Sequence, residues 1–260
     1  LGNVSSINTV EIIIDNQAAI TNSLLESGLY NTNKAVDLTS NEPASIYYTT
    51  DLSTPTTSSI KYTNAIIVSQ TTTIKFFSVD SVGNIEEVKS VEIGIDKQAA
   101  TTSASVASGA YTSNQSVALT SNEQTTIYYT TNGSSPTTSS QEYSGEILVS
   151  ETTAIKYFSV DQVGNTEGLQ LIEITIDTQS PITESSVASG LYNLFQYVEL
   201  STNEPATTYY SLDGSAPTTS SAVYSEILEI TSTTTLRYFS VDSLGNEEAT
   251  KKTVEIEIDS

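Results

Sequence analysis

The chain has 260 residues and carries 31 acidic against 9 basic side chains, so that its formal net charge is −22. It contains no Cys or His, which excludes disulfides, the usual zinc, copper and haem ligands, and the usual Ser-His and Cys-His catalytic pairs. A strongly negative surface repels phosphate backbones, so nucleic acid is not an expected partner. No run reaches the roughly 18 apolar residues of a membrane span, and membrane insertion is not expected.

A period of 81 residues runs through the chain. The pairs Tyr47-Tyr48, Tyr128-Tyr129 and Tyr209-Tyr210 recur at this interval (128 − 47 and 209 − 128). A fixed period of this length is typical of an array of small modules. We therefore predict three repeats, which cover residues 16–96, 97–177 and 178–260, and a leading segment of residues 1–15.

The leading segment matches the end of a repeat, because Val10 to Ile14 align with Val91 to Ile95. The chain thus holds four final strands and three module bodies. One interpretation is a surplus final strand from an upstream repeat, left where a longer array was cut. The other is a donor strand whose Val10, Ile12 and Ile14 complete a sheet edge in a neighbouring subunit and build a filament.

Within each repeat the apolar residues alternate with a period of two, which predicts strands. In chain order the second repeat shows this at Val117 to Leu119, Ile127 to Thr131, Glu146 to Ser150, Ala154 to Val160 and Ile172 to Ile176. Turn residues separate these segments at the short intervals of an all-β sandwich. No segment shows a sustained helical period.

Two turns have a defined chemistry. Asp80 to Gly83 places Asp at the start of a type I turn and Gly where a left-handed backbone is needed, and both other repeats carry the same pattern. A second turn contains Gly133 in the second repeat and Gly214 in the third, whereas the first repeat has Leu52 there. We predict a strained or slightly different turn at Leu52.

The string from Ile127 to Thr137, followed by Tyr143 and by Ile155 to Asn165, resembles the immunoglobulin-like module found at the C-terminus of chitobiase/β-hexosaminidase. The same module occurs in tandem on bacterial surface proteins, and the resemblance covers all three repeats. It implies an all-β fold of three tandem immunoglobulin-like β-sandwiches in an elongated array. It also implies accessory domains without a catalytic set, although a fold alone confers no activity.

In an immunoglobulin-like sandwich two of the loops share the end at which the chain enters, so we expect oxygen ligands to gather at each junction. Such oxygen-only clusters suit calcium. The alternative is that Asp and Asn at turn starts bond local backbone amides. No cofactor is required in either case. The candidate ligands are Asp15, Glu42, Asp80 and Asn84; Asp96, Glu123, Asp161 and Asn165; and Asp177, Glu204, Asp242 and Asn246.

The third repeat departs from the others at Leu194-Phe195-Gln196-Tyr197, where the second has Ser113 to Ser116. Phe195 and Tyr197 share one face of the predicted strand, opposite inward-facing Val198, so both rings should project outward. Leu194, Phe195 and Tyr197 therefore predict a contact with another subunit, a neighbouring domain or a glycan. The alternative is a better-covered sheet edge.

These patterns predict a non-catalytic structural or adhesive array, acting as a semi-rigid stalk of a microbial cell-surface protein or extracellular filament. Its partners would be neighbouring copies or domains, assembled head to tail. The alternative is a polysaccharide-binding accessory module of a secreted glycan-degrading enzyme. An enzyme is not expected, because every candidate acid recurs in turns or on outward-facing strand positions. The sparse lysine and abundant Ser, Thr and Asn favour an extracellular location.

Overall fold

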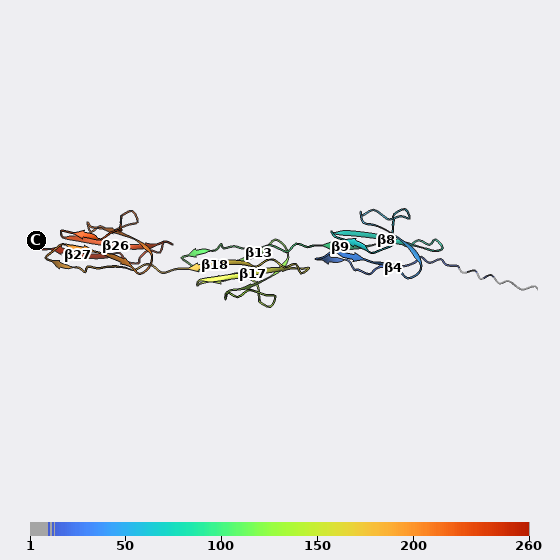
Figure 1. Ribbon diagram of the computed structural model, residues 1–260, viewed down its shortest axis with the longest axis horizontal. Helices are drawn as coiled ribbons and strands as arrows, with labels where there is room; N and C mark the ends of the chain where they lie inside the picture. Colours follow the sequence, from blue (N-terminus) through green and yellow to red (C-terminus); the bar gives the residue numbers. More distant parts are fainter. Residues whose placement is uncertain (1–9, 11, 13, 260) are drawn as a thin grey trace, which may run out of the picture. The chain divides into compact units, whose positions relative to one another are not determined.

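The computed structural model describes residues 10, 12 and 14–259, and its strands fall into three sets of nine (Figure 1). The first repeat contains β1–β9, the second β10–β18 and the third β19–β27. No helix occurs among the described residues, and none of these residues forms a helix able to cross a membrane. The predicted all-β class is confirmed.

The strands have the same lengths in all three repeats. The first contains β1 (Thr21–Ser23), β2 (Gly28–Tyr30), β3 (Lys34–Val36), β4 (Leu38–Ser40), β5 (Ala44–Thr49), β6 (Ile60–Lys61), β7 (Ile66–Val68), β8 (Thr72–Asp80) and β9 (Lys89–Ile95). The second contains β10 (Thr102–Ala104), β11 (Gly109–Tyr111), β12 (Gln115–Val117), β13 (Leu119–Ser121), β14 (Thr125–Thr130), β15 (Gln141–Glu142), β16 (Ile147–Val149), β17 (Thr153–Asp161) and β18 (Gln170–Ile176). The third contains β19 (Thr183–Ser185), β20 (Gly190–Tyr192), β21 (Gln196–Val198), β22 (Leu200–Thr202), β23 (Ala206–Ser211), β24 (Ala222–Val223), β25 (Leu228–Ile230), β26 (Thr234–Asp242) and β27 (Lys252–Ile258).

Each repeat consists of one five-stranded sheet and two two-stranded sheets. In the first repeat the large sheet has the order β2-β9-β8-β5-β6, and the small sheets pair β1 with β4 and β3 with β7. All of these pairs are antiparallel except β2 with β9, which run parallel. The parallel pair recurs as β11 with β18 and β20 with β27.

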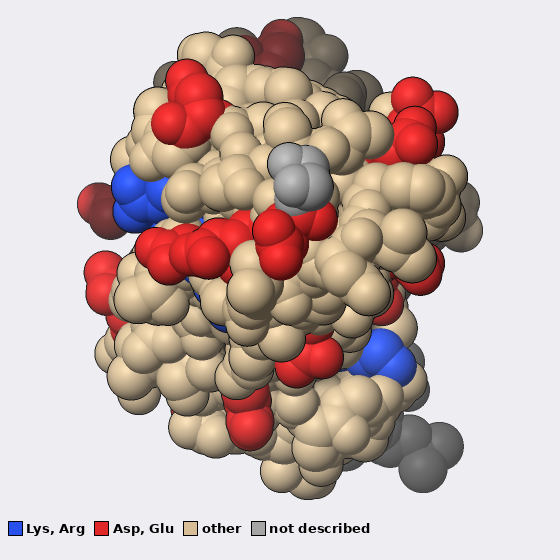
Figure 2. Space-filling model, turned by 90° about the vertical axis from the view of Figure 1, so that its left-hand side faces the viewer, with Lys and Arg blue, Asp and Glu red and all other residues tan. Residues whose placement is uncertain are grey.

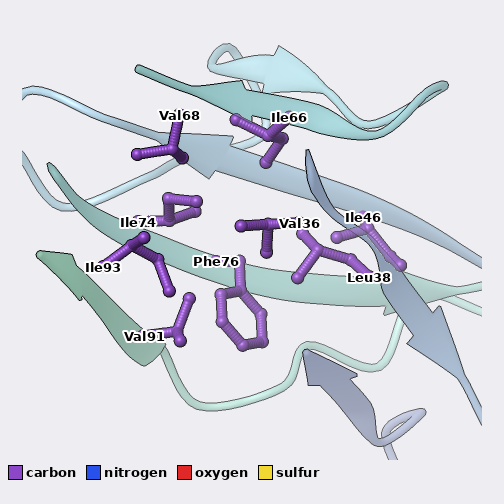
Figure 3. Close-up of a cluster of buried hydrophobic side chains, with 9 residues drawn as sticks. All are labelled: Val36, Leu38, Ile46, Ile66, Val68, Ile74, Phe76, Val91 and Ile93. Atoms are coloured by element: carbon purple, nitrogen blue, oxygen red, sulfur yellow. The ribbon is translucent and has the colours of Figure 1, made fainter. Parts of the chain in front are cut away.

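The core of the first repeat lies between these sheets (Figure 3). Val36 on β3, Ile74 on β8 and Ile93 on β9 are fully buried, and six further apolar side chains complete the cluster. The alternation that predicted the strands places these side chains inward and their polar neighbours outward. Equivalent clusters fill the second and third repeats.

The chain divides into two compact units. The first comprises the described residues up to Thr101 together with Glu123–Thr125 and Val160–Glu167, and the second comprises Thr102–Asn122, Thr126–Ser159 and the described residues from Gly168 onward. Two loops of the second repeat are thus grouped with the first unit.

The leading segment lies partly outside the described residues, which omit 1–9, 11 and 13. Val10, Ile12 and Ile14 are described, belong to no strand, and each is at least 80% exposed. Each of the three repeats already contains its own last strand, β9, β18 or β27. Donation of this segment to a sheet edge of a neighbouring subunit stays a prediction.

The prediction of an unusual turn at Leu52 is confirmed. Leu52 adopts a φ of 68°, whereas Gly133 and Gly214 occupy the same position with φ of 81° and 77°. The left-handed backbone of this turn lets its carbonyl accept a hydrogen bond from a cation on the neighbouring strand. Lys75 Nζ donates to Leu52 O at 2.6 Å, and Lys156 Nζ to Gly133 O at 2.6 Å.

We expect Leu52→Gly to raise the free energy of unfolding of the first repeat by about 1 kcal/mol, because it removes a side chain from a left-handed backbone. The Leu52 side chain is exposed, so its removal sacrifices little packing. The reciprocal change, Gly133→Leu, should destabilise the second repeat by about 1–2 kcal/mol, although a Cβ at Gly133 meets nothing within 4 Å. Denaturant unfolding of both variants tests this, and effects of the same sign would contradict it.

Candidate functional site

The turn that follows the long strand β8 is organised by one aspartate. Asp80 Oδ1 accepts hydrogen bonds from the backbone N–H groups of Val82, Gly83 and Asn84 at 2.9, 2.7 and 2.9 Å. Burial raises the pKa of the Asp80 carboxyl, but the Asn84 amide and these N–H groups outweigh it, so the pKa falls below its ordinary value. The pKa values of Asp161 and Asp242 are lowered for the same reasons.

The asparagine of each turn connects the turn to the segment that enters the repeat. Asn165 Nδ2 donates to Asp161 Oδ2 at 2.7 Å, to the backbone carbonyl of Asp96 at 3.1 Å and to that of Gln98 at 3.2 Å. The amide nitrogens of these asparagines act as donors, and the predicted binding of a metal by their amide oxygens stays a prediction. Asn84 and Asn246 likewise donate to the backbone carbonyls of Asp15 and Asp177.

The structure brings together the carboxylates of two of the three predicted sets. Asp96, Glu123 and Asp161 form one cluster and Asp177, Glu204 and Asp242 the other, each with one oxygen per residue within 4.8 Å of the others. Three carboxylates at such distances repel each other unless a cation or a proton lies between them. Calcium accepts six to eight oxygen ligands, so further ligands would be needed.

The first predicted set does not form such a cluster among the described residues. Asp96 and Asp177 follow the strands β9 and β18, and their N–H groups donate to Tyr30 O and Tyr111 O, which holds them beside the sheet. Asp15 is preceded by described residues that belong to no strand, and it is exposed. Glu42 is likewise not grouped with Asp80.

The third-repeat cluster contains an unsatisfied acceptor. Oε1 of Glu204 is buried and accepts no hydrogen bond from the described residues. A buried carboxylate oxygen without a donor is costly, and a cation would relieve that cost. Calcium binding at both clusters stays a prediction.

If calcium binds, it should raise the melting temperature of the chain, and a chelator should reverse the increase. At a free calcium concentration of 100 times Kd, binding should raise the free energy of unfolding by about 2.7 kcal/mol per site. Glu204→Gln should abolish the gain of the third repeat, whereas Glu199→Gln, an exposed change elsewhere in that repeat, should preserve it. A melting temperature that neither calcium nor chelator moves removes the prediction.

A buried glutamate holds the first strand of a repeat against the segment that precedes its last strand. Glu86 Oε1 accepts from Thr21 N at 2.8 Å, and its Oε2 accepts from Ser78 Oγ at 2.9 Å. Lys89 Nζ lies 2.7 Å from Glu86 Oε1 and donates to Thr21 O at 2.8 Å. Glu248, Lys252 and Thr183 repeat this arrangement in the third repeat.

The pKa of Glu86 reflects this environment. Burial raises the pKa of the carboxyl, but Lys89 and the donors of Thr21 and Ser78 together lower it below its ordinary value of 4.5. A lowered pKa in the folded state adds stability above the unfolded-state pKa. That stability is lost as the pH falls through the lowered folded-state value.

We expect Lys89→Gln to destabilise the first repeat by about 1 kcal/mol at pH 7, because it leaves a buried carboxylate without its cation. The deficit should shrink as the pH falls below 4.5, since a protonated Glu86 no longer needs a counter-charge. Lys61→Gln, which removes an exposed charge from the same repeat, is the control. Denaturant unfolding at pH 7 and at a pH below 4.5 measures the loss of stability in each variant. A loss that does not change with pH would contradict this account.

The predicted aromatic pair of the third repeat projects outward. Phe195 is 47% and Tyr197 57% exposed, and their rings meet edge to face with centroids 5.4 Å apart. Leu194 is also exposed. The contact that these residues were predicted to make stays a prediction.

The roles of two groups of residues were not predicted from the sequence. The buried glutamates Glu86, Glu167 and Glu248 recur at the 81-residue period, which could have indicated a shared structural role. Glu226 and Glu229 lie beside Tyr197 and appear only in the third repeat, so a comparison of the repeats position by position could have found them.

The comparison with known domain families settles the relationship. The family described as chitobiase/beta-hexosaminidase C-terminal domain matches residues 25–90, 106–170 and 187–253, one match in each repeat. The chain belongs to this family. The predicted resemblance to the C-terminal domain of chitobiase/β-hexosaminidase is thereby confirmed. No curated protein matches the chain.

Solved structures show the fold of these domains. The I-band fragment I67–I69 of titin has a TM-score of 0.52 and 10% identity, covering 94% of this chain and 100% of the fragment. Three N-terminal domains of the Hoc protein of bacteriophage RB49 have a TM-score of 0.47 and 10% identity, covering 94% of this chain and 99% of theirs. The fold is three tandem immunoglobulin-like domains, a non-catalytic domain type.

Proposed function

We propose that this chain is a non-catalytic structural array, a load-bearing and semi-rigid stalk of a microbial cell-surface protein or extracellular filament. The domain type, the threefold repetition and the surface of the chain support this. Figure 2 shows one face on which acidic side chains are scattered and few lysines or arginines are visible. Such a charge keeps extended chains soluble.

The observation that carries the proposal is the parallel pairing of the second and last strands in every repeat. Gly28, Leu29 and Tyr30 on β2 pair with Ile93, Gly94 and Ile95 on β9 in the same direction. A pull on the two ends of a repeat acts on the N-terminal end of β2 and on the C-terminal end of β9. These are opposite ends of the parallel pair. Because the strands are parallel, that pull shears all of their hydrogen bonds at once and does not open them one at a time.

Both ends of this parallel ladder are closed by further hydrogen bonds. The N–H of Asp96 donates to Tyr30 O at 2.9 Å, and the N–H of Glu92 donates to Ser27 Oγ at 3.0 Å. The Glu86 carboxylate and Lys89 then hold β1, which precedes β2, by its backbone. The ladder closures recur at Asp177, Glu173, Asp259 and Glu255.

Stiffness between modules would come from the entering segments. These segments lack glycine. Asn84 and Asn165 each donate to two of their backbone carbonyls, and Asn246 donates to one. A segment whose carbonyls are bonded to a folded loop has less freedom than a Gly/Ser linker. Neighbouring copies or domains of the same surface protein are the partners that such an array would have.

The absence of cysteine from the chain allows a pulling experiment with defined geometry. Cysteines at Glu26 and Lys97 load β2 and β9 from opposite ends and shear them, whereas cysteines at Asn31 and Lys97 load them from the same end and unzip them. We expect the unfolding force of the first repeat to be at least about two-fold higher in shear. Equal forces in the two geometries would overturn the load-bearing proposal.

A further inference from the structure

The third repeat contains a hollow at its surface. It has a volume of about 740 Å³ and lies beside the edge strand β24 of the five-stranded sheet and the small sheet of β21 and β25. We call it the third-repeat groove. Its lining residues are Tyr197, Tyr210, Val223, Ser225, Glu226, Ile227, Leu228 and Glu229.

The groove combines an aromatic face with negative charge. Tyr197 and Glu229 face each other across the pair β21–β25, with the Tyr197 hydroxyl 3.5 Å from Glu229 Oε1. Phe195 packs edge to face against Tyr197. Glu226 adds a second exposed carboxylate, and the lining includes neither lysine nor arginine.

The second repeat has no aromatic ring at the position of Tyr197, where Ser116 donates a hydrogen bond to Glu146. Ser116 pairs with Leu148 where Tyr197 pairs with Glu229, and Gly145 stands where the third repeat has Glu226. In the first repeat the corresponding pair is Ala35 with Ile67. The second repeat also carries two carboxylates on this surface, since Glu142 and Glu146 stand where the third repeat has Val223 and Ile227. What the third repeat alone has is an aromatic ring directly opposite a carboxylate, in the pair Tyr197 and Glu229.

We propose that the third-repeat groove binds a basic peptide segment of another protein, by taking an arginine or lysine side chain onto the Tyr197 ring. A guanidinium or ammonium group is attracted to an aromatic face, and its aliphatic stem packs against exposed apolar groups such as Val223 and Ile227. Glu226 and Glu229 supply the counter-charge.

Charge complementarity selects this partner. The chain carries a net charge of −22, so a basic segment is drawn to it from a distance, whereas a second copy of the chain, with 9 basic against 31 acidic side chains, offers this groove little counter-charge. A neutral glycan would also stack on Tyr197, but it would leave two carboxylates to be desolvated without a counter-ion. The proposal assigns a partner to the third repeat and does not depend on the load-bearing role of the array.

The test uses the whole chain and a capped peptide of alternating arginine and glycine, with a peptide of the same length containing citrulline as the uncharged match. Calorimetry should show that the arginine peptide binds about ten-fold more tightly than the citrulline peptide. Tyr197→Ser and the double change Glu226→Gln with Glu229→Gln should each weaken binding by about ten-fold. Circular dichroism should show unchanged folding, since all three side chains are exposed.

The matched control is the double change Glu255→Gln with Glu257→Gln, which removes the same charge from exposed positions on β27. It should change the affinity by less than about two-fold. If both double variants weaken peptide binding equally, the peptide is attracted to the overall charge of the chain. That result would overturn the proposal that the groove is the binding site. Failure of the arginine peptide to bind would also overturn it, as would Tyr197-dependent binding of a neutral chitin oligosaccharide alone.

Discussion

The parallel pairing of the second strand with the last strand is the constraint on which each repeat depends. Without it β9 would be an open edge, and Ile93, which is fully buried, would lie at the rim of the sheet. The pairing also places the N–H of Asp96 on Tyr30 O, which fixes where the chain leaves the repeat. The core, the exit point and the proposed resistance to shear thus depend on the same short ladder.

The ladder has only three residue pairs, so side chains must hold what the backbone does not. Glu86 accepts the N–H of Thr21 from the first strand and is itself held by Lys89 and Ser78. A buried carboxylate is tolerated there because its oxygens are bonded and its charge is countered. The first strand, which pairs with β4 over three residues alone, is thereby joined to the segment that leads into β9.

The sequence predicted the fold well and the sites less well, for physical reasons. Alternation marked strands such as Val91 to Ile95 because their side chains face a core and solvent in turn. Gly28 to Tyr30 is too short to alternate visibly, so its parallel pairing could not be foreseen. The proximity of Asp96, Glu123 and Asp161 followed from the fold. The role of Asn165 did not, because the direction in which an amide points depends on its neighbours.

Because the chain repeats, residues that maintain the fold can be told apart from residues that make a contact in one repeat only. A side chain present in all three copies, such as the aspartate of each turn, meets a need that every module has, and its hydrogen bonds recur with it. A side chain present in one copy meets no such need. Tyr197 and Glu229 are exposed, replace Ser116 and Leu148, and leave the strand pairing beneath them unchanged. Because the fold does not require them, their chemistry is best explained by something that the third repeat touches.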